Sequence, residues 1–244
     1  LLGTSLGLGS AMWRAPRMDK WLGAEGLRVS AFFLALAISL PAFAGNPVAF
    51  VFVMFVMGSA SGLTDVVMNA RVSELEARHS RTLMNANHGV FSLAYAVSAV
   101  STGLAREAGL GPETVLPAVS LVCALIAFTL RIAPEVVEET DETTSTSRGL
   151  SMKILLCGGI VLIAFMTEAT VETWSALYIE RSLGGSPAEG ALGPAMIGLT
   201  MAFGRFSGQA LSVRVSDLTV ILVASLMASA GAAIAATAPT ATVA

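Results

Sequence analysis

The chain has 244 residues, of which 55% are apolar and only 13% are charged, and its mean hydropathy is +0.75. An ordinary soluble domain carries about 25% charged residues, because its surface must stay hydrated. The composition therefore excludes a typical water-soluble domain and indicates that much of the exterior faces lipid. The net charge of −3, without a basic stripe that alternates with aromatic residues, argues against a nucleic-acid partner.

Long uncharged stretches favour membrane-spanning helices. Residues 29–64, 82–105 and 218–244 contain no charged side chain, and each exceeds the ~20 residues that a span requires. Helix formers and glycine dominate, without the sustained alternation of a membrane barrel. Since backbone groups in lipid must be satisfied internally, we expect an all-α, polytopic transmembrane helical bundle.

Apolar runs and breaker residues predict eight full or partial spans. They are expected at about 1–13 (partial), 28–44, 47–70, 87–106, 115–133, 152–179, 190–212 and 218–237. The sequence Gly-Asn-Pro at 45–47 predicts a tight turn, because proline disfavours helix before it and suits a helix start. Both ends of the chain fall in apolar sequence, so we expect a fragment that is cut through helices.

The distribution of Lys and Arg predicts the orientation. Eleven of these residues fall in the predicted loops at 14–28, 71–86, 131–153 and 213–217, whereas the alternate loops hold only Arg106 and Arg181. The first set of loops is therefore expected to be cytoplasmic.

A hydrophilic stretch separates five spans from three. Residues 134–148, PEVVEETDETTSTSR, are too polar to bury enough apolar surface to fold alone. We therefore expect an N-terminal bundle over 1–133, a cytoplasmic linker over 134–151 and a C-terminal bundle over 152–244.

The third predicted span carries a carboxylate on a face of small and polar residues. Gly58, Gly62, Asp65 and Asn69 share one helical face. The two glycines are typical of simple helix packing. An ionisable group inside a span costs about 2.5–3.5 kcal/mol on insertion scales, so Asp65 is expected to face a cavity or a partner. The alternative is a carboxylate at the interface, just outside the hydrocarbon.

Two further groups of polar residues stand out. His88, Ser92 and Tyr95 share a face at the start of the fourth span, and His88 is either a hydrogen-bonded structural residue or a ligand contact. Glu168 and Glu172 lie one turn apart in the sixth span, where like charges repel. Burial and a neighbouring carboxylate both favour the protonated form, so we expect at least one of the pair to hold a proton near neutral pH in some conformations. The alternative places Glu172 at the outer interface.

Enzyme and metal signatures are missing from the sequence. There is no GxSxG, HExxH or P-loop motif, and the GLG sequence at 7–9 follows no predicted strand. His79 and His88, with two cysteines inside apolar stretches, are too few to argue for a metal. We expect neither an enzyme nor a bound cofactor.

Several segments resemble the major facilitator superfamily. The sequence MDKWLG at 18–23, followed by Arg28, resembles the family's loop between helices 2 and 3, with Lys20 where Arg is usual. GRFSG at 204–208, followed by Arg214, resembles the second copy of that loop, six spans later. GLTD at 62–65, HGVFS at 88–92 and WSALY at 174–178 are similar to helices 4, 5 and 7 of the bacterial fucose-permease-like sugar–proton symporters.

The resemblance implies about helices 2 to 9 and the start of 10 from two pseudo-symmetric six-helix halves, in a monomer of the bacterial cytoplasmic membrane. It implies secondary active transport of a small solute, a sugar or related metabolite, coupled to protons through alternating access. The alternatives are efflux of drugs or metabolites by the same fold, or a transporter-like sensor that moves nothing. The expected solute- and proton-binding residues are Asp65, Asn69, His88, Glu168, Glu172 and Trp174. The expected cytoplasmic gate residues are Asp19, Lys20, Arg28, Arg205 and Arg214.

Overall fold

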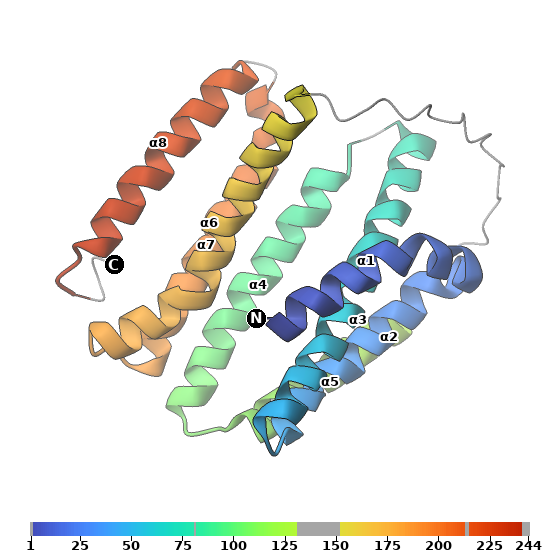
Figure 1. The fold of residues 1–244 in the computed structure, drawn as a ribbon, viewed down its shortest axis with the longest axis horizontal. Helices are drawn as coiled ribbons and strands as arrows, with labels where there is room; N and C mark the ends of the chain where they lie inside the picture. The colour runs from blue at the N-terminus through green and yellow to red at the C-terminus, as the bar shows by residue number, and fades with distance from the viewer. Residues whose placement is uncertain (1, 81, 131–151, 213–214, 241–244) are drawn as a thin grey trace. The chain divides into compact units, whose positions relative to one another are not determined.

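The computed structural model describes residues 2–80, 82–130, 152–212 and 215–240, with the side chains of 209–212 and 217 left out (Figure 1). These residues form helices and no strand. The helices are α1 Leu2–Leu22, η1 Gly23–Glu25, α2 Gly26–Ser39, η2 Leu40–Phe43, α3 Pro47–His79, α4 Met84–Glu107, α5 Pro112–Thr129, α6 Met152–Ser182, α7 Pro187–Ser212 and α8 Asp217–Ala236. The expected all-α class is confirmed. The predicted linker 134–151 and Arg214 lie outside the described residues.

Six stretches of the described chain are long and apolar enough to cross a membrane. They are Leu2–Phe43, Pro47–His79, Met84–Glu107, Pro112–Thr129, Met152–Ser182 and Leu218–Ala236. Their large apolar side chains are widely exposed; in α6, Leu156, Ile163 and Phe165 are each more than 60% accessible. Contiguous exposed apolar surface on this scale suits contact with lipid.

A capping residue and a proline mark the start of α3. Asn46 accepts a hydrogen bond from the Ala49 backbone N–H at 2.8 Å, and Pro47 occupies the first turn of α3. This arrangement is a standard helix start, and it confirms the turn expected at 45–47.

Two predicted loops are shorter than expected. α1 continues to Leu22 and α3 to His79, so much of the predicted loops 14–28 and 71–86 is helical. The loop prediction was wrong because it ended each helix with its apolar run. Helices extend beyond an apolar run where polar side chains pair, and Arg71 contacts both Asp19 and Glu74 at 3.0 and 2.8 Å.

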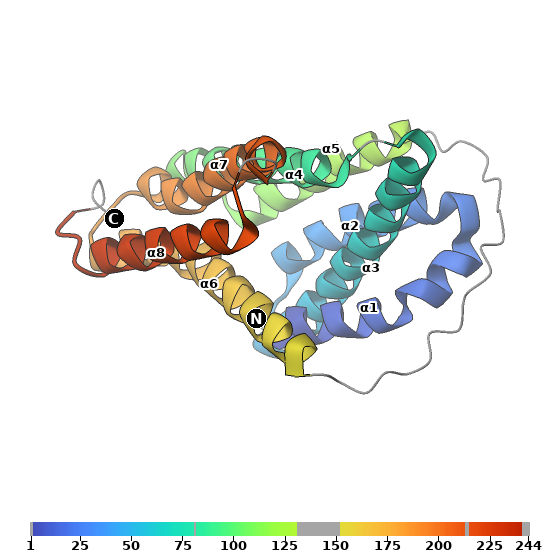
Figure 2. The ribbon, with the colours of Figure 1, turned by 90° about the horizontal axis from the view of Figure 1, so that it is seen from above.

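The first of two compact units contains α1, α2, α3 and α5. α1 packs along α3, and α2 packs on α3 and α5 (Figure 2). Glycines permit the first contact: a Cβ on Gly7 would meet the Phe55 carbonyl oxygen, and a Cβ on Gly58 would meet that of Thr4. Such close backbone approach is the usual basis of helix association in membranes. Ala11 and Ala15 of α1 form a buried cluster with Leu63 and Val67 of α3.

The second unit contains α4, α6, α7 and α8. α6 packs on α7, and the Tyr178 hydroxyl donates to the Ala235 carbonyl of α8 at 3.0 Å. α4 approaches α7 through small residues, since a Cβ on Gly103 would meet the Ala191 side chain. Contacts thus group α4 with the helices that follow 152. The predicted division into bundles over 1–133 and 152–244 stays a prediction.

Candidate functional site

In the first unit, the Asp65 carboxylate of α3 accepts a hydrogen bond from the Asn69 amide one turn away. The Asn69 side-chain N–H donates to Asp65 Oδ1 at 3.2 Å, and both residues are partly buried. The Thr64 hydroxyl donates to the Ser30 carbonyl at 3.0 Å and so ties this part of α3 to α2. Asn69 Oδ1 is buried without a hydrogen-bond partner among the described residues. Asp65 and Asn69 therefore form one polar unit within a candidate span.

The predicted gate residue Asp19 contacts an arginine that the sequence prediction missed. Asp19 Oδ1 lies 3.0 Å from Arg71 Nη2, which also donates to the Gly23 carbonyl at 3.1 Å. The two side chains are 21% and 14% exposed, so this ion pair is largely shielded from solvent. The sequence prediction includes Arg71 only among the charges of the loop at 71–86. It misses the contact because it does not extend α3 as far as this residue.

The other predicted gate residues of this unit lie near the same end of α1 and α2. Arg28 pairs with Glu25 at 3.7 Å, and its guanidinium lies 5.5 Å from the centre of the Phe128 ring. Lys20 is exposed in the last turn of α1. A role of these residues in gating stays a prediction.

In the second unit, Arg205 joins α7 to α4. Its Nη1 donates to the His88 carbonyl at 3.0 Å and to the Ser92 hydroxyl at 2.5 Å. Ser92 is 1% exposed, and its own hydroxyl donates to the His88 carbonyl at 2.9 Å. His88 thus contributes its backbone to this contact, and the role of its imidazole stays a prediction.

The two carboxylates of α6 lie near a tyrosine and an arginine from neighbouring helices. Glu168 and Glu172 are both partly buried, and both lie within electrostatic range of Tyr95 on α4. Glu172 also lies within electrostatic range of Arg205. Trp174, one of the predicted binding residues, is 54% exposed. The structure therefore places Tyr95 within electrostatic range of both carboxylates and Arg205 within electrostatic range of Glu172, whereas the sequence prediction assigned these residues to separate roles or to none.

A second polar contact ties the C-terminal end of α4 to α6. Arg106 makes two hydrogen bonds to Glu180, Nη1 to Oε1 at 2.7 Å and Nη2 to Oε2 at 2.8 Å. The neighbouring Glu107 Oε2 accepts from the Ser186 hydroxyl at 3.0 Å and from the Ala188 backbone N–H at 3.1 Å, at the start of α7. Within the described part of the chain, no three His, Cys, Asp or Glu residues are placed to hold a metal ion.

Comparison with known proteins assigns the family. The model of the Major Facilitator Superfamily matches residues 2–244. The chain belongs to the major facilitator superfamily. It is therefore a multi-pass membrane protein of a family of transporters rather than enzymes.

Curated relatives in this superfamily agree with the assignment. The chain is 27% identical to an uncharacterized MFS-type transporter of Yersinia pestis, over 88% of the chain and 56% of the relative. It is 23% identical to the membrane protein MosC of Rhizobium meliloti, over 83% and 49%. It is 26% identical to an uncharacterized transporter of Sinorhizobium fredii, over 79% and 50%. The chain thus spans about half the length of these relatives. No solved structure matches it.

Proposed function

We propose that the chain forms part of a secondary active transporter, which moves a small solute across the bacterial cytoplasmic membrane by alternating access and couples this movement to protons. The observation that carries the proposal is the pair Glu168 and Glu172, one turn apart in an apolar helix long enough to span a membrane. Each ionisable group costs about 2.5–3.5 kcal/mol at the centre of a span on insertion scales. Proton exchange by the carboxylate pair is a functional reason for the helix to tolerate this cost.

The surroundings of the carboxylates support this role. Arg205 supplies a positive charge within electrostatic range of Glu172, and Tyr95 lies within electrostatic range of both carboxylates. Gain or loss of a proton on Glu172 changes its attraction to Arg205, which is bound to α4 through Ser92. Proton exchange is thereby linked to the contact between α4 and α7, and a transporter must be able to change such helix contacts.

Asp65 and Asn69 are the proposed solute-binding residues of the other unit. Their hydrogen bond leaves Asp65 with further acceptor capacity, and Asn69 Oδ1 has no partner among the described residues. Carboxylate and amide groups bind the hydroxyls of sugars well. With the resemblance to the fucose-permease-like symporters, this supports a sugar or related metabolite as the solute. Relatives from Yersinia pestis and Sinorhizobium fredii that are called transporters support the broader function.

The test is uptake by the full-length protein in proteoliposomes under an imposed pH gradient, with sugars as the first solutes. Asp65→Asn, Glu168→Gln and Glu172→Gln are compared with Glu113→Gln, which alters an exposed carboxylate in the first turn of α5. We expect gradient-driven uptake to fall at least tenfold in Glu168→Gln or Glu172→Gln and to persist in Glu113→Gln. If uptake survives all three site substitutions, the carboxylates are structural, and facilitated diffusion or drug export is the better account. If no solute moves, the sensor alternative holds.

A further inference from the structure

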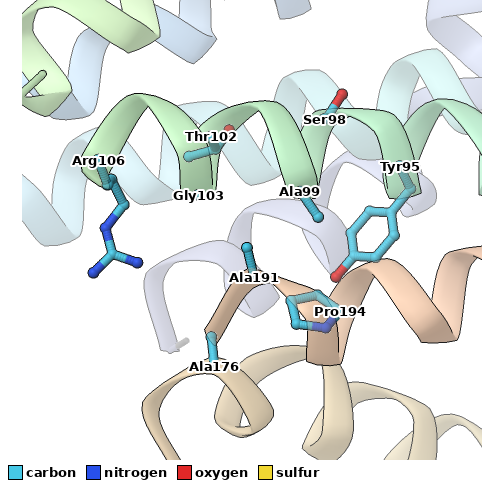
Figure 3. A pocket seen from close by; sticks show the side chains of 9 residues that line it. All are labelled: Tyr95, Ser98, Ala99, Thr102, Gly103, Arg106, Ala176, Ala191 and Pro194. Atoms are coloured by element: carbon cyan, nitrogen blue, oxygen red, sulfur yellow. The ribbon is translucent and has the colours of Figure 1, made fainter. Parts of the chain in front are cut away.

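A pocket of about 300 Å³ lies within the second unit, between α4, α6 and α7 (Figure 3). The polar part of its lining comes from α4 and consists of Tyr95, Ser98, Thr102 and Arg106. The facing wall is small and apolar, with Ala176 of α6 and Ala191 and Pro194 of α7. Tyr95 and Arg106 stand at opposite ends of the pocket in Figure 3. Tyr95 and Arg106 also take part in the interactions described above, whereas the other residues of the pocket do not.

The sequence produces this pocket by combining one polar helix face with small residues. Tyr95, Thr102 and Arg106 are separated by seven and four residues, so they recur on the same side of α4. Gly103 lies so close to α7 that a Cβ would meet Ala191. The backbones thus approach at one point, while the short side chains of Ala176 and Ala191 leave the space beside it open.

The hydroxyl groups of the pocket have hydrogen-bonding capacity to spare. Hydroxyls in helices commonly donate to a carbonyl of their own helix, as those of Ser92 and Thr200 do here. Within the described residues, the hydroxyls of Tyr95, Ser98 and Thr102 make no hydrogen bond. Each can act as donor and acceptor, so a bound molecule with hydroxyls of its own can satisfy them.

The charge in the pocket is already compensated. Both terminal nitrogens of Arg106 are bound to the carboxylate of Glu180, at 2.7 and 2.8 Å. An anion would have to compete with this two-point contact, and a cation would meet a guanidinium. A neutral ligand meets neither obstacle.

We propose that this pocket is the second unit's binding site for the transported solute, as Asp65 and Asn69 are proposed to be for the first unit, and that the solute is a compact neutral molecule with hydroxyls on one side and an apolar face on the other. Its hydroxyls would contact the Tyr95, Ser98 and Thr102 side, and its apolar face would lie on the alanine and proline wall. The volume is at the lower limit of the ~300–1,000 Å³ of small-molecule pockets, which suits a single ring rather than several. This inference rests on the proposed transport function and places solute next to Tyr95, which lines the pocket.

The test measures binding to the purified full-length protein by titration calorimetry, without any gradient. The probes are monosaccharides and cyclic polyols, with a carboxylate and an amine of similar size beside them. Thr102→Val removes a hydroxyl with little change of shape, and Ala176→Leu fills the pocket. The matched controls are Thr200→Val, whose hydroxyl is bound within α7, and Ala164→Leu at an exposed site of α6.

We expect a neutral hydroxylated probe to bind, Thr102→Val to weaken its affinity about fivefold to tenfold, and Ala176→Leu to weaken it by more than about tenfold. Both controls should stay within about twofold of the wild type. If uptake occurs but binding is unchanged in both pocket variants, the pocket assignment is wrong and the transport function stands. If the pocket variants lose binding but no probe is transported, the pocket stands and the transport function fails. Binding of only the charged probes, or of none, would overturn the proposed solute class.

Discussion

The packing of α1 on α3 gives a sharp test of the first unit, because two glycines in α1 differ only in what faces them. A Cβ on Gly7 would meet the Phe55 carbonyl oxygen and would lie 2.9 Å from the Ser59 backbone nitrogen. A Cβ on Gly9, two residues later, would meet nothing within 4 Å. Gly7→Ala and Gly9→Ala are therefore the same chemical change at a crowded site and at an open one.

The size of the difference follows from these contacts. Replacing glycine by alanine inside a helix gains about 1 kcal/mol of helix propensity at either position. At Gly7 the new methyl group meets backbone atoms that cannot rotate away, so the helices must separate. Overpacking of this kind costs about 1–3 kcal/mol. Because the propensity gain is common to both variants, the predicted difference between them is also about 1–3 kcal/mol, with Gly7→Ala the less stable.

The assay is equilibrium unfolding of the full-length protein in mixed micelles of a mild detergent and dodecyl sulfate, followed by circular dichroism. Gly9→Ala should match or exceed the wild type in its free energy of unfolding, and Gly7→Ala should fall below Gly9→Ala by the stated amount. Equal stability of the two variants would refute the close approach of α1 and α3 at Gly7.

Two further predictions concern polar contacts and use the same unfolding assay. Arg71→Ala removes the hydrogen bonds to Asp19, Gly23 and Glu74 and should cost about 2–3 kcal/mol, because bonds to charged groups are worth more than neutral ones. Arg78→Ala, at an exposed site in the last turn of α3, is its control, and an equal loss in both would contradict the shielded ion pair. Ser92→Ala removes the buried hydroxyl that accepts from Arg205 and should cost about 1–3 kcal/mol, whereas the exposed Ser101→Ala should cost less than about 0.5 kcal/mol. A Ser92→Ala variant as stable as Ser101→Ala would show that Arg205 does not depend on this contact.

The sequence predicted the helical class because the signals for it are local. Apolar runs of sufficient length predict spans, and prolines at 47 and 112 occupy the first turns of α3 and α5. Helix ends were less accurate where charges pair across helices. The helical extension that carries Arg71 depends on Asp19, which is 52 residues away in the sequence, and no local pattern reports that contact.

The candidate site could be predicted only in part for the same reason. Asp65 with Asn69, and Glu168 with Glu172, are neighbours on one helix, so spacing alone identifies them. Arg205 lies 113 residues from Ser92, and the sequence could not indicate that it reaches α4 instead of acting only at a loop. Tyr95 belongs to a polar face that the sequence shows, but its electrostatic interaction with the carboxylates depends on how α4 meets α6, which Arg106 and Glu180 also join.

Solute-induced proton movement shows whether this protein couples a small neutral solute to protons through the α6 carboxylates, as we propose. Full-length protein is reconstituted in proteoliposomes that enclose a pH-sensitive dye, and solute is added outside without any initial pH gradient. A symporter that carries solute inward should acidify the interior on addition of a transported solute, and Glu168→Gln or Glu172→Gln should remove this signal while Glu113→Gln retains it. Solute entry without any change of internal pH, or a signal of wild-type size in both Glu168→Gln and Glu172→Gln, would show that these carboxylates do not couple solute to protons.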